Sequence, residues 1–184
     1  MRLIALCDTP ATPWRNGKGT TRELVAWPDA QDWMLRFSVA DIERDGPFSP
    51  WPGVTRDFCV LDGAGVALRW QDGHEERLEP GGEPLRFDGA DAPLARLIDG
   101  PTRDLNLMTR DGCDARLEIG GDDRRVRQRP WGCFTAEQGR IAIVNGEGFD
   151  VPALTLVWFE DAAISASFDG RCWWIARGAS RYRA

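Results

Sequence analysis

Short segments in which apolar and polar residues alternate recur along the whole chain, and this pattern most constrains the fold. In the clearest segment, residues 33–40, every second residue from Trp33 to Val39 is apolar. A period of two is typical of a β-strand with one buried face. Gly, Pro and Asp residues separate similar β signals at residues 22–27, 58–61, 65–71, 84–88, 104–108, 115–119, 140–144, 154–159 and 171–176. Because no segment shows sustained helical periodicity, the sequence predicts an all-β fold.

A faint internal repeat indicates that the chain contains two related halves. "LDGAG" at 61–65 resembles "VNGEG" at 144–148, and each is followed by an "FDG", at 87–89 and at 168–170. We interpret the matches as a duplication that gives two β-barrels or sandwiches, with residues 1–99 in one and 100–184 in the other, packed as a single unit. The 184 residues, 42% of them hydrophobic, are enough for a real core.

Charge and composition argue against several classes of partner. The formal net charge is -6, and the cluster Arg124, Arg125, Arg127 and Arg129 has acidic neighbours, so we expect no nucleic-acid partner. No run approaches the roughly 20 apolar residues of a membrane span, and no leader pattern opens the chain, so a cytoplasmic protein is expected. The five cysteines are scattered without a C-x-x-C pattern and are interpreted as buried thiols.

The stretch "PWRNGKGTTRE", residues 13–23, raises the possibility of a phosphate-binding loop. A P-loop needs a glycine, then four residues, then Gly-Lys and a Ser or Thr, with a strand before the loop and a helix after it. Here Gly19 follows Lys18, position 12 is Thr, and the apolar run that follows stops at Pro28. The stretch therefore does not predict a nucleotide site, although it holds the only lysine of the chain.

A metal centre or a serine hydrolase site also lacks its usual residues. His74 is the only histidine and lies in the turn-like "DGHEE", where a solvent-exposed position is expected. Metal sites in cupin barrels use two or three histidines with a carboxylate, so we expect no metal and no cofactor. Ser49 lies in "PFSPW", which is not a nucleophile elbow.

Polar residues occupy strand positions where apolar residues are usual. Arg36 and Ser38 share one strand face, and Asp104, Asn106 and Met108 share another. An inward-facing arginine must be paired or must bind an anion. Two explanations stay open: internal ion pairs, Arg36 with Asp104 or Arg56 with Glu23, and a pocket for a small anion.

Three motifs in one order resemble the HutD/Ves family, which comprises an accessory protein of bacterial histidine utilisation and its stress-induced relative. They are "PWRNGKGTTRE" at 13–23, "DGPFSPWPGVTR" at 45–56 and "RDLNLM" at 103–108. The resemblance implies a bicupin, two cupin barrels in one chain, without the cupin metal. It also implies a protein that binds a small acidic metabolite of the histidine pathway and restrains flux or expression. Lys18 departs from the family pattern, which has a small residue there, and its role stays open.

Two functions follow from the resemblance and the polar residues. In the favoured one, a binding or regulatory protein, Arg36 and Arg56 meet the carboxylate of urocanate, formiminoglutamate or formylglutamate. The other is a metal-free isomerase or lyase with Glu23 or Asp104 as general base. A homodimer stays open. The expected binding residues are Arg15, Asn16, Thr21, Glu23, Arg36, Ser38, Phe48, Ser49, Arg56, Asn106 and Met108.

Overall fold

Strands make up almost all of the regular structure, as the alternating pattern predicts. The computed structural model describes residues 1–121, 125–160 and 164–178, so Arg124 of the arginine cluster lies outside the described residues. Within them the one helix is the 3₁₀ turn η1 (Leu6–Asp8). In this part of the chain no helix has the length and apolar character needed to cross a bilayer. The all-β, cupin-like fold class is confirmed.

The chain forms two compact units, which we describe separately. The first unit is Pro10–Cys113, and the second unit is Met1–Thr9 together with Asp114–Ala184. The first contains β2 (Thr12–Pro13), β3 (Gly19–Trp27), β4 (Leu35–Ile42), β5 (Gly46–Pro47), β6 (Val54–Asp62), β7 (Val66–Arg69), β8 (Glu75–Leu78), β9 (Leu85–Asp88), β10 (Leu94–Leu97) and β11 (Thr102–Arg110). The second contains β1 (Arg2–Ala5), β12 (Ala115–Gly120), β13 (Arg127–Gln128), β14 (Gly132–Thr135), β15 (Gly139–Ile143), β16 (Phe149–Val151), β17 (Thr155–Trp158), β18 (Ser165–Phe168) and β19 (Cys172–Arg177).

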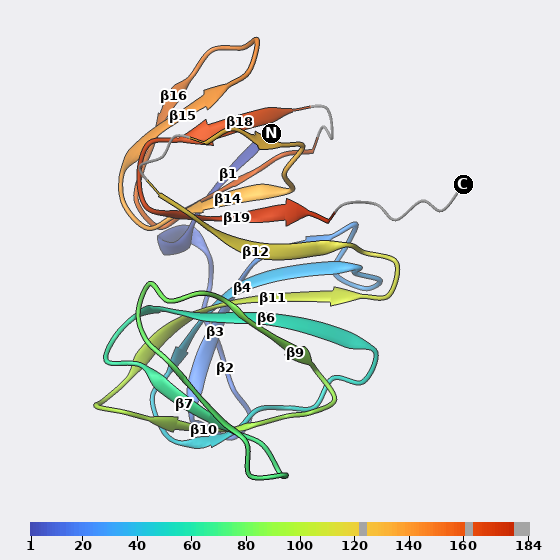
Figure 1. Ribbon diagram of the computed structural model, residues 1–184, viewed down its shortest axis with the longest axis vertical. Coiled ribbons are helices and arrows are strands. Elements are labelled where there is room, and N and C mark those ends of the chain that lie inside the picture. Colours follow the sequence, from blue (N-terminus) through green and yellow to red (C-terminus); the bar gives the residue numbers. More distant parts are fainter. Residues whose placement is uncertain (122–124, 161–163, 179–184) are drawn as a thin grey trace. The chain divides into compact units, whose positions relative to one another are not determined.

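Each unit is built from two antiparallel sheets. In the first unit a six-stranded sheet has the order β2-β3-β4-β11-β6-β9, and a four-stranded sheet has the order β5-β10-β7-β8. Strands β4, β11 and β6 lie side by side (Figure 1). Residues from both sheets form one buried cluster: Ile42, Phe48, Phe58, Val60, Val66, Leu68 and Ala95. This cluster is the core of a sandwich whose strands alternate between inward and outward residues.

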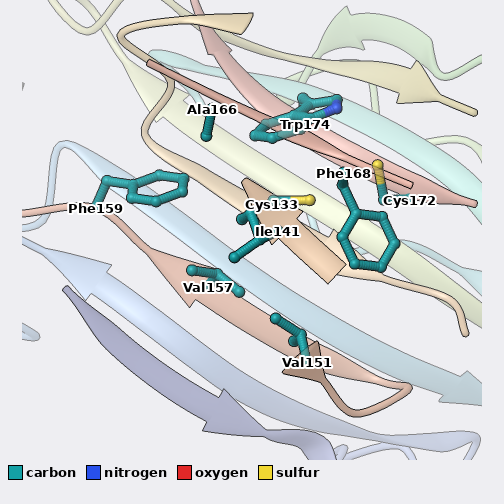
Figure 2. Close-up of a cluster of buried hydrophobic side chains, with 9 residues drawn as sticks. All are labelled: Cys133, Ile141, Val151, Val157, Phe159, Ala166, Phe168, Cys172 and Trp174. Carbon is teal, nitrogen blue, oxygen red and sulfur yellow. The ribbon is translucent and has the colours of Figure 1, made fainter. Parts of the chain in front are cut away.

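The second unit has the same construction. Its five-stranded sheet has the order β1-β17-β14-β19-β12 and its four-stranded sheet the order β13-β18-β15-β16. Figure 2 shows the core between them, formed by Cys133, Ile141, Val151, Val157, Phe159, Ala166, Phe168, Cys172 and Trp174. The adjacent Trp173 and Trp174 are both buried although successive strand residues point to opposite faces.

The two units share one strand order, which agrees with two cupin-like halves. The eight strands β4 to β11 occupy the same relative places in their sheets as β12 to β19 do in theirs. The matches that suggested the repeat are nevertheless not equivalent in this topology. "LDGAG" joins β6 to β7, whereas "VNGEG" joins β15 to β16, the counterparts of β7 and β8. The two "FDG" motifs end β9 and β18 and are likewise one strand out of step.

The unit boundaries differ from the expected halves 1–99 and 100–184 at both ends. Strand β11 lies between β4 and β6, so the first unit continues to Cys113. At the other end, β1 pairs with β17 from Arg2↔Trp158 to Ala5↔Thr155, so the chain begins in the second unit. An edge strand far away in sequence leaves no local signal of the sheet that it joins.

Candidate functional site

A cavity of about 610 Å³ lies on the face of the six-stranded sheet of the first unit, over β4, β11 and β6. Its size lies in the range of small-molecule sites. Two further segments complete it: the turn between β2 and β3, and the segment that follows β5. The lining residues are Pro13, Trp14, Arg15, Asn16, Thr21, Arg36, Ser38, Ala40, Ile42, Pro47, Phe48, Ser49, Trp51, Arg56, Phe58, Asn106 and Met108.

Strand register places the polar floor of the cavity in two rows. Met108 lies opposite Arg36 on one side and Arg56 on the other, so the two arginines flank it from β4 and β6. In the next row Asn106 lies opposite Ser38 and Phe58. Because side chains of alternate residues share a face, both rows point to the same side of the sheet.

Arg56 is a buried cation held by an amide and two aromatic rings. Arg56 is 8% exposed, and its Nε and Nη2 atoms donate to Asn106 Oδ1 at 3.1 and 3.0 Å. The guanidinium carbon lies 4.6 Å from the centre of the Phe48 ring and 5.4 Å from that of Phe87. Burial lowers the pKa of Arg56 to about 10, which leaves it charged at neutral pH. No carboxylate of the described residues forms an ion pair with it.

Arg36 has a different environment, because a carboxylate compensates its charge. Its Nε forms an ion pair with Glu23, which lies opposite Ser38 on β3. Its guanidinium carbon also lies beside the Trp33 and Trp51 rings, at 5.9 and 5.8 Å from their centres. The expected ion pairs were therefore wrong in both combinations: Glu23 pairs with Arg36, not with Arg56, and Arg36 does not pair with Asp104.

Asp104 lies on the same face of β11 as Asn106 and Met108, but it does not line the cavity. It is fully buried, and Thr102 Oγ1 donates to its Oδ2 at 2.9 Å. Burial raises the pKa of Asp104 to about 8, and the charge of Asp41 adds to the rise, while the Thr102 hydrogen bond opposes it. At neutral pH this carboxyl group is therefore mostly protonated.

The stretch that resembled a phosphate loop forms part of the cavity wall and leads into a strand. Trp14 Nε1 donates to Thr21 Oγ1 at 2.7 Å, which closes the turn between β2 and β3. Gly17 has φ of +64°, a conformation that favours glycine. At Gly19 a Cβ atom would lie 2.3 Å from the Asp41 carbonyl oxygen, so only glycine fits against β4. The two glycines serve the turn and the strand pairing.

Ten of the eleven expected binding residues line this one cavity, all except Glu23, which reaches it through Arg36. Arg15, Asn16 and Ser49 are exposed at its edge, whereas Ser38, Phe48, Arg56 and Met108 are buried. Much of the apolar lining was not predicted from the sequence: Pro13, Trp14, Ala40, Ile42, Pro47, Trp51 and Phe58. Ala40 and Ile42 continue the alternation of Arg36 and Ser38, and that signal was sufficient to find them.

The donor atoms around the cavity do not fit a cupin metal ion. The lining contains neither histidine, cysteine nor carboxylate, and it contains three arginines. In the described parts of the chain no three His, Cys, Asp or Glu side chains gather as a metal-binding group. His74 is exposed, as expected, with its Nε2 3.1 Å from Glu76 and its ring beside Trp70. Such a lining suits an anion better than a divalent cation.

The prediction of buried thiols is confirmed for three of the five cysteines and is wrong for Cys7 and Cys113. Cys59, Cys133 and Cys172 are buried, Cys113 is half-buried and Cys7 is exposed. Burial raises the pKa values of the Cys59 and Cys133 thiols, so both are protonated at neutral pH.

Comparison with known proteins gives the family. The HutD family model matches residues 7–175. The chain belongs to the HutD family. Among curated relatives, Protein Ves of Citrobacter koseri is 32% identical over 176 residues, which cover 94% of this chain and 83% of the relative. Protein Ves of Escherichia fergusonii is 29% identical over 177 residues, covering 95% and 83%.

One solved structure agrees with this membership, and a second shares the fold. HutD from Pseudomonas fluorescens has a TM-score of 0.82 and 26% identity, over 97% of this chain and 99% of that one. A conserved protein of unknown function from Pseudomonas aeruginosa has a TM-score of 0.80 and 24% identity, over 97% and 99%. The second likeness concerns the fold alone.

Proposed function

We propose that this HutD family member is a binding protein for a small carboxylate metabolite, which it holds in the cavity of the first unit. One observation carries the proposal: Arg56 is buried at the cavity, charged at neutral pH, and without a carboxylate partner among the described residues. A buried cation of this kind is costly unless an anion compensates it. A ligand carboxylate supplies that compensation through charge-assisted hydrogen bonds.

The neighbours of Arg56 provide orientation for such a ligand. Asn106 Oδ1 accepts from Arg56, so the side-chain NH₂ of Asn106 remains to donate to the ligand. The hydroxyl groups of Ser38 and Ser49 offer further hydrogen bonds from the floor and the edge. The rings of Trp14, Phe48, Trp51 and Phe58 offer apolar contact to the body of the ligand.

Charge compensation inside the cavity favours one carboxylate over two. Arg36 is already neutralised by Glu23, and Arg15 is exposed where solvent screens its charge. Arg56 alone offers a buried, uncompensated charge. Among urocanate, formiminoglutamate and formylglutamate, the planar monocarboxylate urocanate therefore matches the aromatic lining best, and we expect it to bind more tightly than the two dicarboxylates.

The biological role that we propose is an accessory or regulatory one, in bacterial histidine utilisation or in a stress response, in the cytoplasm and without nucleic acid as partner. Membership of the HutD family and the curated relatives named Protein Ves support it. Ligand occupancy would then report the level of an acidic metabolite of that pathway.

A metal-free enzyme finds less support in the geometry. Glu23, one general-base candidate, is held in an ion pair with Arg36. Asp104, the other, does not line the cavity and is hydrogen-bonded to Thr102. A general base must reach the proton that it removes, and neither group is free to do so here.

Calorimetric titration with urocanate, formiminoglutamate and formylglutamate tests the proposal. We expect saturable 1:1 binding with urocanate the tightest, and no consumption of any of the three when each is incubated with the protein and followed by chromatography. Absence of binding to all three acids would contradict the binding proposal, and turnover of one of them would favour the enzyme.

A further inference from the structure

Lys18, the only lysine of the chain, connects two segments that both line the cavity. Its Nζ donates to the Asp45 carbonyl oxygen at 2.6 Å. Its own carbonyl oxygen accepts from the backbone amides of Glu43 and Arg44, at 2.9 and 3.3 Å. The Lys18 amide donates to Asn16 Oδ1 at 3.0 Å, which ties the residue to the turn between β2 and β3.

The aliphatic part of Lys18 packs against Gly46. A Cβ atom at Gly46 would lie 2.5 Å from the Lys18 Cδ atom, so the lysine stem occupies the space that a side chain would need. On its other side the same segment is bound to β10 and to the residue before it: Leu97 N donates to Asp45 Oδ1 at 2.8 Å, and Phe48 N donates to the Pro93 carbonyl oxygen at 2.9 Å. Lys18 and β10 thus hold residues 43–48 from two directions.

Phe48 transmits this restraint to the cation of the cavity. Phe48 is 7% exposed. Its ring packs edge-on against that of Phe58, with 5.3 Å between the ring centres, and the Phe48 ring centre lies 4.6 Å from the guanidinium carbon of Arg56. Displacement of residues 45–48 would therefore remove one of the two rings that enclose Arg56.

We propose that Lys18 is a positioning residue: its ammonium group clamps residues 43–48 to the turn at 14–18 and so holds Phe48 against Arg56. The purpose of the clamp, a preformed anion site, rests on the proposed function, whereas the clamp itself does not. Preorganisation of this kind improves affinity by lowering the ordering cost of binding.

Hydrogen exchange tests the clamp without any ligand. In Lys18→Met, which keeps the stem and loses the donor, the Phe48 amide and the Arg56 Nε–H should exchange about 3 to 10 times faster, as loss of one net hydrogen bond predicts. Arg56 is assigned from the signal that disappears in Arg56→Met. The Nε–H of Arg103, which donates to Asp41 at 2.7 Å, serves as the internal control and should not change. Lys18→Arg should restore the wild-type rates.

A double substitution separates the clamp from general loosening. Gly46→Ala should displace the lysine stem and accelerate exchange at Phe48 in the wild-type background, but add little in Lys18→Ala, since the stem is already absent. Additive effects, or unchanged exchange at Phe48 and Arg56 in Lys18→Met, would overturn the clamp.

Urocanate titration then tests what the clamp is for. Its dissociation constant should rise about 3- to 10-fold in Lys18→Met and recover in Lys18→Arg. If the wild type binds no urocanate, the proposed function fails, and the exchange rates still decide the clamp. If urocanate binds the wild type and Lys18→Met equally, the clamp does not act on the anion site.

Discussion

At the scale of single residues, two ionisable groups, Arg56 and Asp104, are buried on one sheet face of the first unit, and the first is charged at neutral pH while the second is mostly neutral. Arg56 keeps its charge at neutral pH because burial lowers its pKa only to about 10, and Asn106 and two rings contact its guanidinium. Asp104 has one hydroxyl partner, Thr102, and burial favours its neutral form. The first group can attract an anion, while the second is a buried acid that lowers stability whenever it must ionise.

Asp104 should therefore make the stability of the protein depend on pH. The pKa is about 8 in the folded protein and about 3.9 in an unfolded chain, so between these values the folded state holds a proton that the unfolded state lacks. Stability then falls as pH rises, by up to about 1.4 kcal/mol per pH unit. The asparagine side chain in the Asp104→Asn variant does not titrate. The free energy of unfolding of this variant, relative to that of the wild type, should therefore rise from pH 5 to pH 8. Urea unfolding at four pH values measures this, and a constant difference would contradict the assignment.

Much of the candidate site could be predicted at this scale, because cations at inward-facing strand positions are conspicuous. Arg36 was found in this way, and Asn106 as a polar residue on such a face, whereas Arg56 was named only as a possible partner of Glu23 and within the motif at residues 45–56. Their partners could not be predicted: alternation fixes the face of a residue, but which carboxylate reaches which arginine depends on register and on the bulge in β3 between Glu23 and Val25.

At the scale of elements, β3 and the turn before it depend on two glycines for different reasons. Gly17 needs its positive φ and has no neighbour within 4 Å of an added Cβ, whereas Gly19 needs the space beside the Asp41 carbonyl oxygen.

Gly17→Ala should lower the free energy of unfolding by about 1–2 kcal/mol, and Gly17→Asn should recover most of the loss, because asparagine tolerates this conformation. Gly19→Ala should lower it by about 1–3 kcal/mol through overpacking, and Gly19→Asn should be no better. Thermal or urea unfolding of the four variants measures the differences. Equal rescue by asparagine at both positions would contradict the distinction.

The sequence predicted the long strands better than the short ones. Strand β4 and the central part of β11 carry clear alternation, and both were expected within a few residues of their bounds. Strands β5, β10 and β18 have two to four residues and include Gly, Pro, Ala or Ser, so their pairing depends on neighbours that no local pattern shows.

At the scale of the whole molecule, the two units share the order of eight strands, but the first unit adds two strands, β2 and β3, whereas the second adds one, β1. In the first unit β3 lies beside β4, whereas in the second unit β1 lies beside β17. Composition and period predicted two β units; the contribution of residues 2–5 to the second unit follows only from the sheet pairing.

Deletion of residues 2–5 should therefore affect one unit selectively. Strand β17 would become an edge, and its amides (Thr155–Trp158) should lose protection from hydrogen exchange, while β11 between β4 and β6 should keep its protection. Exchange measured by mass spectrometry on peptides from both strands gives the comparison. Equal loss in both strands would contradict the assignment of β1 to the second unit alone.

The most direct test of the central claim, that Arg56 is the anion-binding group of the cavity, is the thermal shift produced by urocanate. At one hundred times its dissociation constant a ligand stabilises a fold by about 2.7 kcal/mol. For a chain of this size the midpoint should rise by roughly 5 to 10 °C. Arg56→Met should stay folded, since methionine suits the apolar surroundings, and should lose the shift, while Arg96→Met, an exposed arginine of β10 outside the cavity, should keep it. A shift that survives in Arg56→Met, or no shift in the wild type with any of the three acids, would contradict the account.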